Sequence, residues 1–367
     1  MDIGMLGGSM EKKNIVLIIV IILAVITVIL LFALSLSSND ENGIIPWPDG
    51  NGETVERSEW AFETTEITDL NDLGYDGDGV VVGIVDTGID TSHPDLDHIN
   101  ITAWMDYVNG QSAPYDDEGH GTMMAGIIAA SGEIDGAAPK VDMVVVKAIS
   151  SSGSGSSSDV AAGIDFCVAN GADVICLSLG GRARRFNLGD DTAQACDRAI
   201  EQGVFVVAAA GNDGEDSNDN DVDSPATVED VIAVGAIDKN KHIASFSSIG
   251  DNDGRTPFPI DDRQDPDKKP ELTAPGVDIV STYPNSKYAE GSGTSQSTAF
   301  VAGCIALLLD ANPDWQREGS SGGDGDAIDE FKDVFMDTAE KLPEQDTPHD
   351  DYYGYGLIQA MDAEARL

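Results

Sequence analysis

Basic residues are scarce in this chain, and their scarcity excludes one class of partner. The 367 residues contain 20 Lys and Arg against 66 Asp and Glu, which gives a formal net charge of −46. Nucleic acid is excluded because phosphate binding needs a basic face. A strongly acidic surface repels itself, and salt screens that repulsion, so the composition indicates a saline setting and a halophilic protein. The alternative is an ordinary acidic secreted protein.

Cysteine is the next shortage, with four residues in the whole chain. Their spacing matches neither a metal-ligand motif nor a dense disulfide framework. Each lies within an apolar run, where a thiol behaves as a small hydrophobic group. We therefore predict buried free thiols at Cys167, Cys176, Cys196 and Cys304.

Residues 15–36 form a nearly unbroken apolar run. At about 1.5 Å rise per residue, about 20 such residues cross a hydrocarbon core of about 30 Å as a helix. Lys12 and Lys13 precede the run, and Asp40 and Glu41 follow it. Positive residues stay on the cytoplasmic side, so we predict a single-pass anchor in the lipid bilayer of the cell membrane, with the N-terminus inside.

The parts on either side of this run follow from the predicted topology. Residues 1–14 would form a short cytoplasmic tail, and residues 37–57, rich in Asn, Asp, Gly and Pro, are typical of a flexible linker. Residues 58–367 would form one domain. The alternative to an anchor is a cleaved secretory signal, for which Ala33 and Ser35 offer small residues at a cleavage site. Both interpretations make the domain extracellular.

Short apolar runs alternate with helix-like segments through this domain. Runs that are apolar throughout are typical of strands buried on both faces, as in parallel sheets. The alternation predicts an α/β fold with three layers, in which helices flank a mainly parallel central sheet. The predicted strands are 80–85, 141–148, 172–179, 204–210 and 231–236, the helices are 120–130, 159–170, 192–202 and 294–310, and two surface insertions are 251–269 and 317–326.

Three segments carry the polar residues of an activated serine nucleophile. Asp86 ends an apolar run in GIVDTGID, His120 stands in DEGHGTMMAG, and Ser295 stands in GSGTSQSTAF. A serine hydroxyl is a poor nucleophile until a base takes its proton, and a carboxylate fixes the tautomer of that base. Ser295 would lie at the start of the predicted helix 294–310, where free N–H groups and the helix dipole favour developing negative charge.

The chain resembles the subtilisin-type serine peptidases from about residue 58 to its end. The matching segments occur in family order and include VVVGIVDTGIDTSHPDL, GHGTMMAGIIAA, ADVICLSLGG, VFVVAAAGNDG, LTAPGVDIVST, GSGTSQSTAFVAGCIALL and YGYGLIQA. The order Asp, His, Ser along the chain is the one that the family uses. The resemblance implies the same three-layer fold and a serine endopeptidase that acts on protein or peptide substrates through an acyl-enzyme.

The resemblance also implies roles for individual residues. Asp86 would orient His120, His120 would serve as general base toward Ser295, and the Asn212 side chain would donate to the oxyanion beside the Ser295 N–H. Two edges would pair with an extended peptide, and a third segment would line the P1 pocket. These segments are Ser178, Leu179 and Gly180; Gly153, Ser154 and Gly155; and Ala209, Ala210 and Gly211.

Asp223 is implied to lie at the floor of the P1 pocket. Counting from Asn212 without a gap to Ser224 and Pro225 places Asp223 where many relatives have a glycine. A carboxylate there would favour Lys or Arg at P1 by direct pairing. The alternative is that Asp223 simply belongs to the acidic stretch 213–223.

Two residues after the nucleophile depart from the family pattern. Gln296 stands where many relatives have Met, and Ala299 stands where a Pro is usual. Neither belongs to the predicted triad, and both are expected to adjust the start of the helix.

The resemblance implies no cofactor for the chemistry. Asp95 matches a position that often binds structural calcium in relatives, but the loop 131–138 is shorter than the loop that supplies further ligands in them. We therefore predict no metal among the site residues. Calcium held by other carboxylates stays open.

Two alternatives to a subtilisin-type peptidase remain. A carboxyl-type serine peptidase shares the fold but uses Glu in place of the His and Asp in place of the Asn, and both His120 and Asn212 argue against it. A catalytically inactive domain, displayed at the membrane as a binding module, would usually have lost a member of the triad.

Overall fold

The computed structural model describes residues 45–46, 56–181, 190–216, 221–250 and 263–367. The chain divides into two units, residues 1–45 and 46–367, and the second unit holds the folded domain. The predicted tail, the predicted anchor and most of the predicted linker lie outside the described residues, as does most of the insertion 251–269. The predicted boundaries of these parts therefore stay predictions.

A parallel sheet forms the centre of the domain. Among the described residues it has seven strands in the order β3-β4-β2-β5-β6-β7-β8, and each neighbouring pair is parallel. The five predicted strands are confirmed within two residues at each end, because strands covered on both faces are apolar throughout. The strands are β2 (Val81–Asp86), β3 (Ile101–Asp106), β4 (Asp142–Lys147), β5 (Val174–Leu177), β6 (Phe205–Ala209), β7 (Ile232–Ile237) and β8 (Leu272–Pro275).

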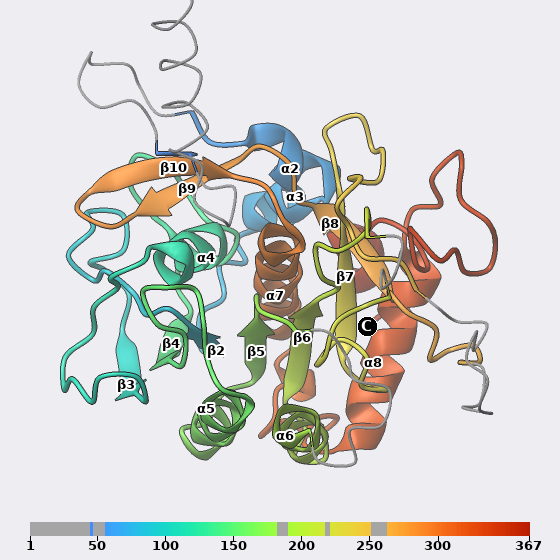
Figure 1. Ribbon diagram of the computed structural model, residues 1–367. Helices are drawn as coiled ribbons and strands as arrows, with labels where there is room; N and C mark the ends of the chain where they lie inside the picture. The colour runs from blue at the N-terminus through green and yellow to red at the C-terminus, as the bar shows by residue number, and fades with distance from the viewer. Residues whose placement is uncertain (1–44, 47–55, 182–189, 217–220, 251–262) are drawn as a thin grey trace, which may run out of the picture. The chain divides into compact units, whose positions relative to one another are not determined.

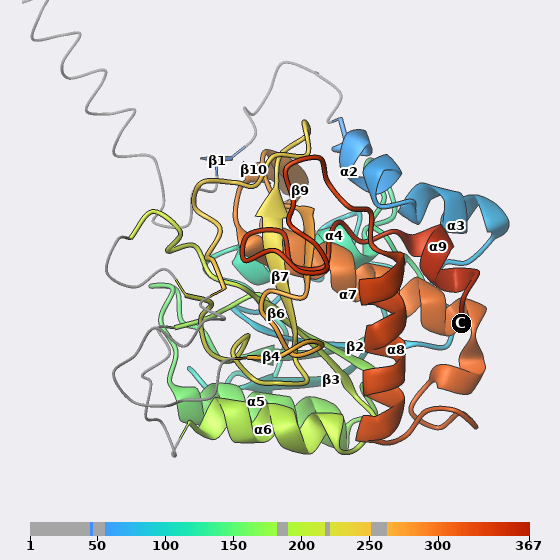
Figure 2. The same cartoon turned by 90° about the vertical axis from the view of Figure 1, so that its right-hand side faces the viewer.

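Helices cover both faces of this sheet, which confirms the predicted three-layer α/β fold. Figures 1 and 2 show α5 (Ser157–Ala169) and α6 (Asp191–Ile200) along one face. On the other face lie α4 (His120–Ala129) and α7 (Thr294–Ala311). Both helices of this second layer begin at residues that the sequence marks for chemistry. The layer arrangement therefore brings two distant motifs to one side of the sheet.

Smaller elements complete the described chain. The strands β9 (Ile279–Tyr283) and β10 (Lys287–Gly291) pair antiparallel, and β9 packs on α4. The predicted insertion 317–326 is irregular up to Asp324 and then enters α8. The other elements are β1 (Ile45–Pro46), α2 (Glu59–Thr64), α3 (Ile67–Leu73), the 3₁₀ turn η1 (Pro313–Trp315), α8 (Gly325–Thr338) and α9 (Ala360–Glu364).

Helix α7 is the central helix of the domain. Among the described residues it is the one helix long and apolar enough to cross a membrane, but 83% of it is buried inside the protein. It packs on β5, β6, β7 and β8, and on α4. Burial on all sides fixes the position of its first turn, which carries Ser295.

The start of α5 differs from the predicted one. We predicted a helix from residue 159 with Ser158 or Asp159 as its cap, but the helix begins at Ser157. Ser156 is the N-cap, because its Oγ accepts a hydrogen bond from the Asp159 N–H at 3.1 Å. The predicted end is confirmed by Gly171, whose φ of +85° suits the residue after a helix.

All four cysteines are buried and free, as predicted. Burial disfavours the thiolate, so it raises the pKa of each thiol, that of Cys176 to about 12. These side chains therefore act as small apolar groups in the core.

Two lysines and one glutamate form a buried ion cluster at the start of β8. Lys269 and Glu271 are fully buried, and Lys332 on α8 is 3% exposed. The Lys269 Nζ lies 2.5 Å and the Lys332 Nζ lies 2.9 Å from the same Glu271 Oε1. Both ammonium groups also donate to the Glu229 carbonyl oxygen, at 3.0 and 2.7 Å. One carboxylate thus serves two buried lysines, and burial lowers the pKa of Lys269 to about 7 while the Glu271 charge keeps that of Lys332 raised.

We predict that Glu271→Gln destabilises the domain by roughly 3–5 kcal/mol, because it leaves two buried ammonium groups without a counter-charge. The free energy of unfolding would be measured in denaturant, in a Ser295→Ala background that removes the predicted nucleophile. Glu340→Gln is the matched control. It breaks an ion pair with Lys241 whose side chains are 35% and 39% exposed, and it should cost about 1 kcal/mol or less. Equal losses in the two variants would contradict the prediction.

Candidate active site

Asp86 and His120 form a direct pair in the structure. Asp86 is the last residue of β2 and is 1% exposed. Both of its carboxylate oxygens lie 2.9 Å from the His120 Nδ1, and its Oδ1 also accepts a hydrogen bond from the Thr87 N–H at 2.6 Å. The carboxylate therefore holds the proton on Nδ1 and leaves Nε2 as the nitrogen that can act as a base.

Two glycines allow the chain to bring this pair together. Gly88 has a φ of +118°, and a Cβ atom on it would lie 2.0 Å from the Tyr115 carbonyl oxygen. Gly119, the N-cap of α4, has a φ of +120°, and a Cβ atom there would lie 2.3 Å from the Tyr283 ring. Only glycine combines such a φ with such close contacts. The backbone therefore passes close to Tyr115 at Gly88, just after Asp86, and close to Tyr283 at Gly119, just before His120.

The electrostatics of the loop before α4 favour a charged imidazole. Burial lowers the pKa of His120, but Asp86, by charge and hydrogen bond, and the charges of Glu118 and Asp116 raise it by more, to about 9. The Glu118 Oε2 also accepts a hydrogen bond from the His120 N–H at 2.7 Å. At neutral pH the imidazole therefore carries a proton that it must lose before it can act as a base.

Ser295 lies in the first turn of α7, next to the end of β5. Its hydroxyl donates a hydrogen bond to the Ser178 carbonyl oxygen at 3.1 Å, and the Ser178 hydroxyl donates to the Ser295 carbonyl oxygen at 2.9 Å. The structure thus joins the predicted nucleophile to one substrate-binding segment. Within the described part of the chain, the Ser295 hydroxyl forms no hydrogen bond with His120. To donate to that imidazole, the hydroxyl would have to give up its hydrogen bond to Ser178.

The side chain next to Ser295 on α7 contacts a side chain that lies one helical turn after His120 on α4. Gln296 follows Ser295 on α7, and its Nε2 lies 3.4 Å from the Sδ of Met123, which follows His120 by one turn of α4. This contact joins the starts of the two helices. The packing of α4 against α7 therefore joins the first turns of the two helices that carry the predicted base and the predicted nucleophile.

Asn212 follows β6 and is held by the residue before the nucleophile. Its Oδ1 accepts hydrogen bonds from the Thr294 N–H at 3.0 Å and from the Thr294 hydroxyl at 3.1 Å. These bonds fix the orientation of the amide, so Nδ2 is the end that remains to donate. Thr294 was not among the predicted site residues, although its place directly before Ser295 could have identified it.

One predicted peptide-binding segment, residues 153–155, is connected to the strand that ends at Asp86. The Ser150 N–H donates to the Ser154 carbonyl oxygen at 2.9 Å, and Gly155 forms an antiparallel bridge with Ile149. The Ile149 N–H in turn donates to the Asp86 carbonyl oxygen at 3.1 Å. The turn that contains Gly153 and Gly155 is therefore tied to the strand that carries Asp86.

Asp223 lies between two other predicted substrate-binding segments. It is 8% exposed, and its N–H donates to the Ala210 carbonyl oxygen at 2.8 Å. A Cβ atom on Gly211 would lie 2.6 Å from the Asp223 Oδ2, and one on Gly180 would lie 3.0 Å from the Asp223 Cβ. The Asp223 side chain thus packs directly against Gly211 and Gly180, where a larger residue would collide with it.

Asp95 does not present a vacant carboxylate to a cation. Its oxygens accept hydrogen bonds from the N–H groups of Glu133 and Ile134, each at 3.1 Å, and from the Tyr288 hydroxyl at 2.8 Å. The short loop 131–138 therefore closes on this side chain with donors rather than with further oxygen ligands. Across the described residues, no group of three or more His, Cys, Asp or Glu side chains is placed to hold a metal ion.

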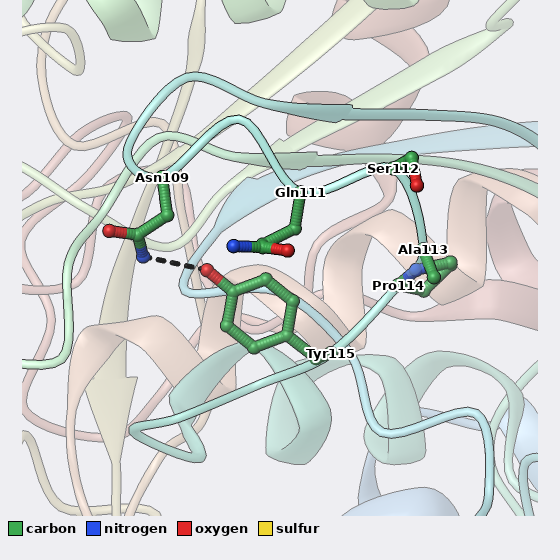
Figure 3. A pocket seen from close by; sticks show the side chains of 6 residues that line it. All are labelled: Asn109, Gln111, Ser112, Ala113, Pro114 and Tyr115. Carbon is green, nitrogen blue, oxygen red and sulfur yellow. Dashed lines mark hydrogen bonds between the residues drawn. The ribbon is translucent and has the colours of Figure 1, made fainter.

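A surface pocket of about 590 Å³ lies in the loop between β3 and α4, and Figure 3 shows the six residues that line it. None of the predicted site residues is among them. The Asn109 Nδ2 donates a hydrogen bond to the Tyr115 hydroxyl at 2.7 Å. That hydroxyl donates in turn to the Asp106 carboxylate at 3.1 Å. The Tyr115 carbonyl oxygen accepts a hydrogen bond from the Ile89 N–H. We interpret the pocket as the outer side of a loop that supports the Asp86 segment.

Lys147 is a further residue of the site that the sequence did not reveal. It ends β4 and is fully buried. Its Nζ donates to the Thr87 carbonyl oxygen at 2.5 Å, to the Ile149 carbonyl oxygen at 3.0 Å and to the Asp117 carboxylate at 2.7 Å. It therefore fastens together the chain segments after β2 and β4, directly beside Asp86.

Comparisons with known proteins agree with this architecture. Residues 77–356 match the model of the subtilase family. Subtilisin DY from Bacillus licheniformis is 42% identical over 65% of this chain and 80% of its own length. Subtilisin NAT from Bacillus subtilis subsp. natto is 35% identical over 80% of this chain and 68% of its own length. Subtilisin Savinase from Lederbergia lenta is 38% identical over 70% of this chain and 86% of its own length.

We predict that the His120 imidazole titrates near pH 9 and that Glu118→Gln lowers its pKa by up to about one pH unit. The sign follows because the Glu118 charge stabilises the protonated imidazole, so its removal favours the neutral form. The measurement is the pH dependence of the imidazole proton resonances, assigned by their loss in His120→Gln. Asp97→Asn removes an exposed acid elsewhere and should leave the value unchanged. An unshifted His120 in Glu118→Gln would contradict the prediction.

Proposed function

Because this chain belongs to the subtilase family and is a serine endopeptidase, we propose that it cleaves peptide bonds through an acyl-enzyme formed on Ser295. His120 takes the proton from the Ser295 hydroxyl as the oxygen attacks the scissile carbonyl, and it returns that proton to the leaving amine. Asp86 orients the imidazole and stabilises its charged form. The observation that carries this proposal is the pairing of both Asp86 oxygens with the His120 Nδ1 at 2.9 Å.

The oxyanion is proposed to form at the start of α7. Its two donors would be the Asn212 Nδ2 and the Ser295 N–H, which lies in the first turn of the helix. The support for Asn212 is the pair of hydrogen bonds from Thr294 that hold its amide in one orientation. Donors that are fixed before the reaction need no reorganisation when negative charge develops.

Neither alternative function has comparable support. A carboxyl-type peptidase would need Glu at the position of His120 and Asp at the position of Asn212. A binding module without activity would have no need for the buried Asp86–His120 pair, and burying a carboxylate is costly unless it has a function or a partner. The active enzyme is therefore the better hypothesis.

The substrate is proposed to bind as an extended peptide with a basic P1 residue. The main chains of residues 178–180 and 153–155 would pair with it on either side. Ala209, Ala210 and Gly211 would line the P1 pocket. The position of the Asp223 carboxylate against Gly211 and Gly180 supports a pocket that accepts Lys or Arg.

The proposed location is the outer face of the cell membrane, with residues 15–36 as a single-pass anchor and residues 58–367 as the extracellular catalytic domain. This rests on the sequence, since the anchor lies outside the described residues. Enzyme labelled at its nucleophile should remain in membranes that are washed at alkaline pH. Release of all label into the medium would instead favour a cleaved secretory signal.

We predict that a fluorophosphonate probe labels the full chain at Ser295 and that Ser295→Ala abolishes labelling. Ser292→Ala, a nearby serine with no proposed role, should be labelled like the wild type. In Asn212→Ala, kcat should fall about 10²–10³-fold, a magnitude taken from the corresponding donor of a subtilisin. The assays belong in high salt because of the acidic surface. Labelling that persists in Ser295→Ala would disprove the proposed nucleophile.

For P1 selectivity, we predict that a peptide library is cut mainly after Arg and Lys. Asp223→Asn should lower kcat/KM for these peptides by about tenfold or more and leave peptides with Leu at P1 nearly unchanged, because only the charge pair is lost. Asp221→Asn is the matched control, since Asp221 lies two residues away and pairs with Arg263. Preferred cleavage after Phe or Leu in the wild type would refute this assignment.

A further inference from the structure

Gln296 has a buried oxygen without a hydrogen-bond partner, directly beside the nucleophile. The residue is 2% exposed, and its Oε1 is one of four buried side-chain N or O atoms in the described residues that lack a partner. An unsatisfied buried acceptor costs about 1–3 kcal/mol. Such a cost at the start of α7 indicates that a ligand absent from the free enzyme satisfies this oxygen.

The contacts of the Gln296 side chain determine which end of its amide is the NH₂ group and which is the oxygen. The other end, Nε2, lies 3.4 Å from the Met123 Sδ, and a thioether sulfur can only accept a hydrogen bond. The NH₂ group therefore points to Met123 and the oxygen points to Gly293. A Cβ atom on Gly293 would lie 3.0 Å from the Gln296 Oε1 and 3.4 Å from the Asn212 Nδ2. The unpartnered acceptor thus lies beside the same glycine as the proposed oxyanion donor.

We propose that Gln296 is a positioning residue for hydrolysis of the acyl-enzyme: its Oε1 accepts a hydrogen bond from the attacking water. This inference rests on the proposed function. A water molecule has two O–H bonds, and the His120 Nε2 can take only one of the protons. The Asp86 and Asn212 oxygens already accept hydrogen bonds, so the second O–H has no acceptor among the proposed catalytic groups. The Gln296 side chain offers one without bringing a charge near the oxyanion.

The proposed step is the second half of the reaction. The water oxygen bonds to the acyl carbon while His120 takes one of its protons, and the oxyanion forms beside Asn212. The intermediate then collapses, the bond from the acyl carbon to the Ser295 Oγ breaks, and His120 gives its proton to that Oγ. The acid product leaves with the second water proton, which Gln296 held by a hydrogen bond throughout.

The first half of the reaction makes a smaller demand on this residue. The attacking group is then the Ser295 hydroxyl, which has a single proton, and His120 accepts it. No second O–H has to be oriented. Loss of the Gln296 oxygen should therefore slow deacylation much more than acylation.

The test is burst kinetics of the full-length enzyme with an activated ester, in which the burst reports acylation and the steady state reports deacylation. Gln296→Met removes the amide while nearly keeping the side-chain length, and Gln296→Leu is a second variant without an acceptor. We expect both to lower the deacylation rate constant about tenfold, the loss of one hydrogen bond. The acylation rate constant should stay within about twofold of the wild type. Gln316→Met, which lies beyond the far end of α7 and directly after η1, is the control and should change neither step.

The outcomes separate this inference from the proposed function. Absence of a burst and of probe labelling in the wild type would disprove the proposed function itself. A wild-type burst, together with unchanged deacylation in Gln296→Met and Gln296→Leu, would overturn the role of Gln296 alone. Equal slowing of both steps would also overturn it, because that is the effect of a merely structural side chain.

Discussion

The burial of α7 is the constraint on which the site depends. The helix packs against four strands and α4, so its first turn cannot shift without disturbing the core. That turn carries Thr294, Ser295 and Gln296, and each of them bonds to a different segment: Asn212 after β6, Ser178 after β5, and Met123 on α4. Parallel strands end at one edge of a sheet, and a helix anchored in the core gathers the loops that leave this edge. The geometry of the site is therefore a consequence of packing far from the reacting atoms.

A second constraint is electrostatic, and it differs between the exposed charges of the surface and the buried charges of the site. The chain carries a net charge of −46, and most of the described Asp and Glu side chains are exposed or partly exposed, where salt screens their charge. The Asp86–His120 pair is buried, so its attraction is screened far less. Glu118 and Asp116 lie near enough to add to it, and together these carboxylates keep the imidazole protonated at neutral pH. Salt therefore screens the surface charge much more than the charge of the site.

The sequence predicted those features that depend on local pattern. Five strands were found because burial on both faces makes them apolar throughout, whereas β3 was missed because it is partly exposed, and β8 because it is short and includes Pro275. Motif spacing placed Asp86 and His120 in separate segments, and their pairing was implied by the family resemblance and not by the spacing. The ion cluster could not be predicted, since Glu271 and Lys332 are far apart in the chain. The hydrogen bond of the Ser295 hydroxyl to Ser178 depends on a side-chain rotamer, which no sequence pattern reports.

One group at the start of α7 is unsatisfied in the free protein, if the proposed reaction is set aside. The Gln296 Oε1 is buried and has no hydrogen-bond partner. A buried unsatisfied group alone costs about 1–3 kcal/mol, and a sequence selected only for stability would remove it. A water that attacks an acyl group on Ser295 would satisfy this oxygen, because Gln296 is the next residue of the same helical turn. The unsatisfied oxygen is therefore better explained by a bound reaction intermediate than by a defect of packing.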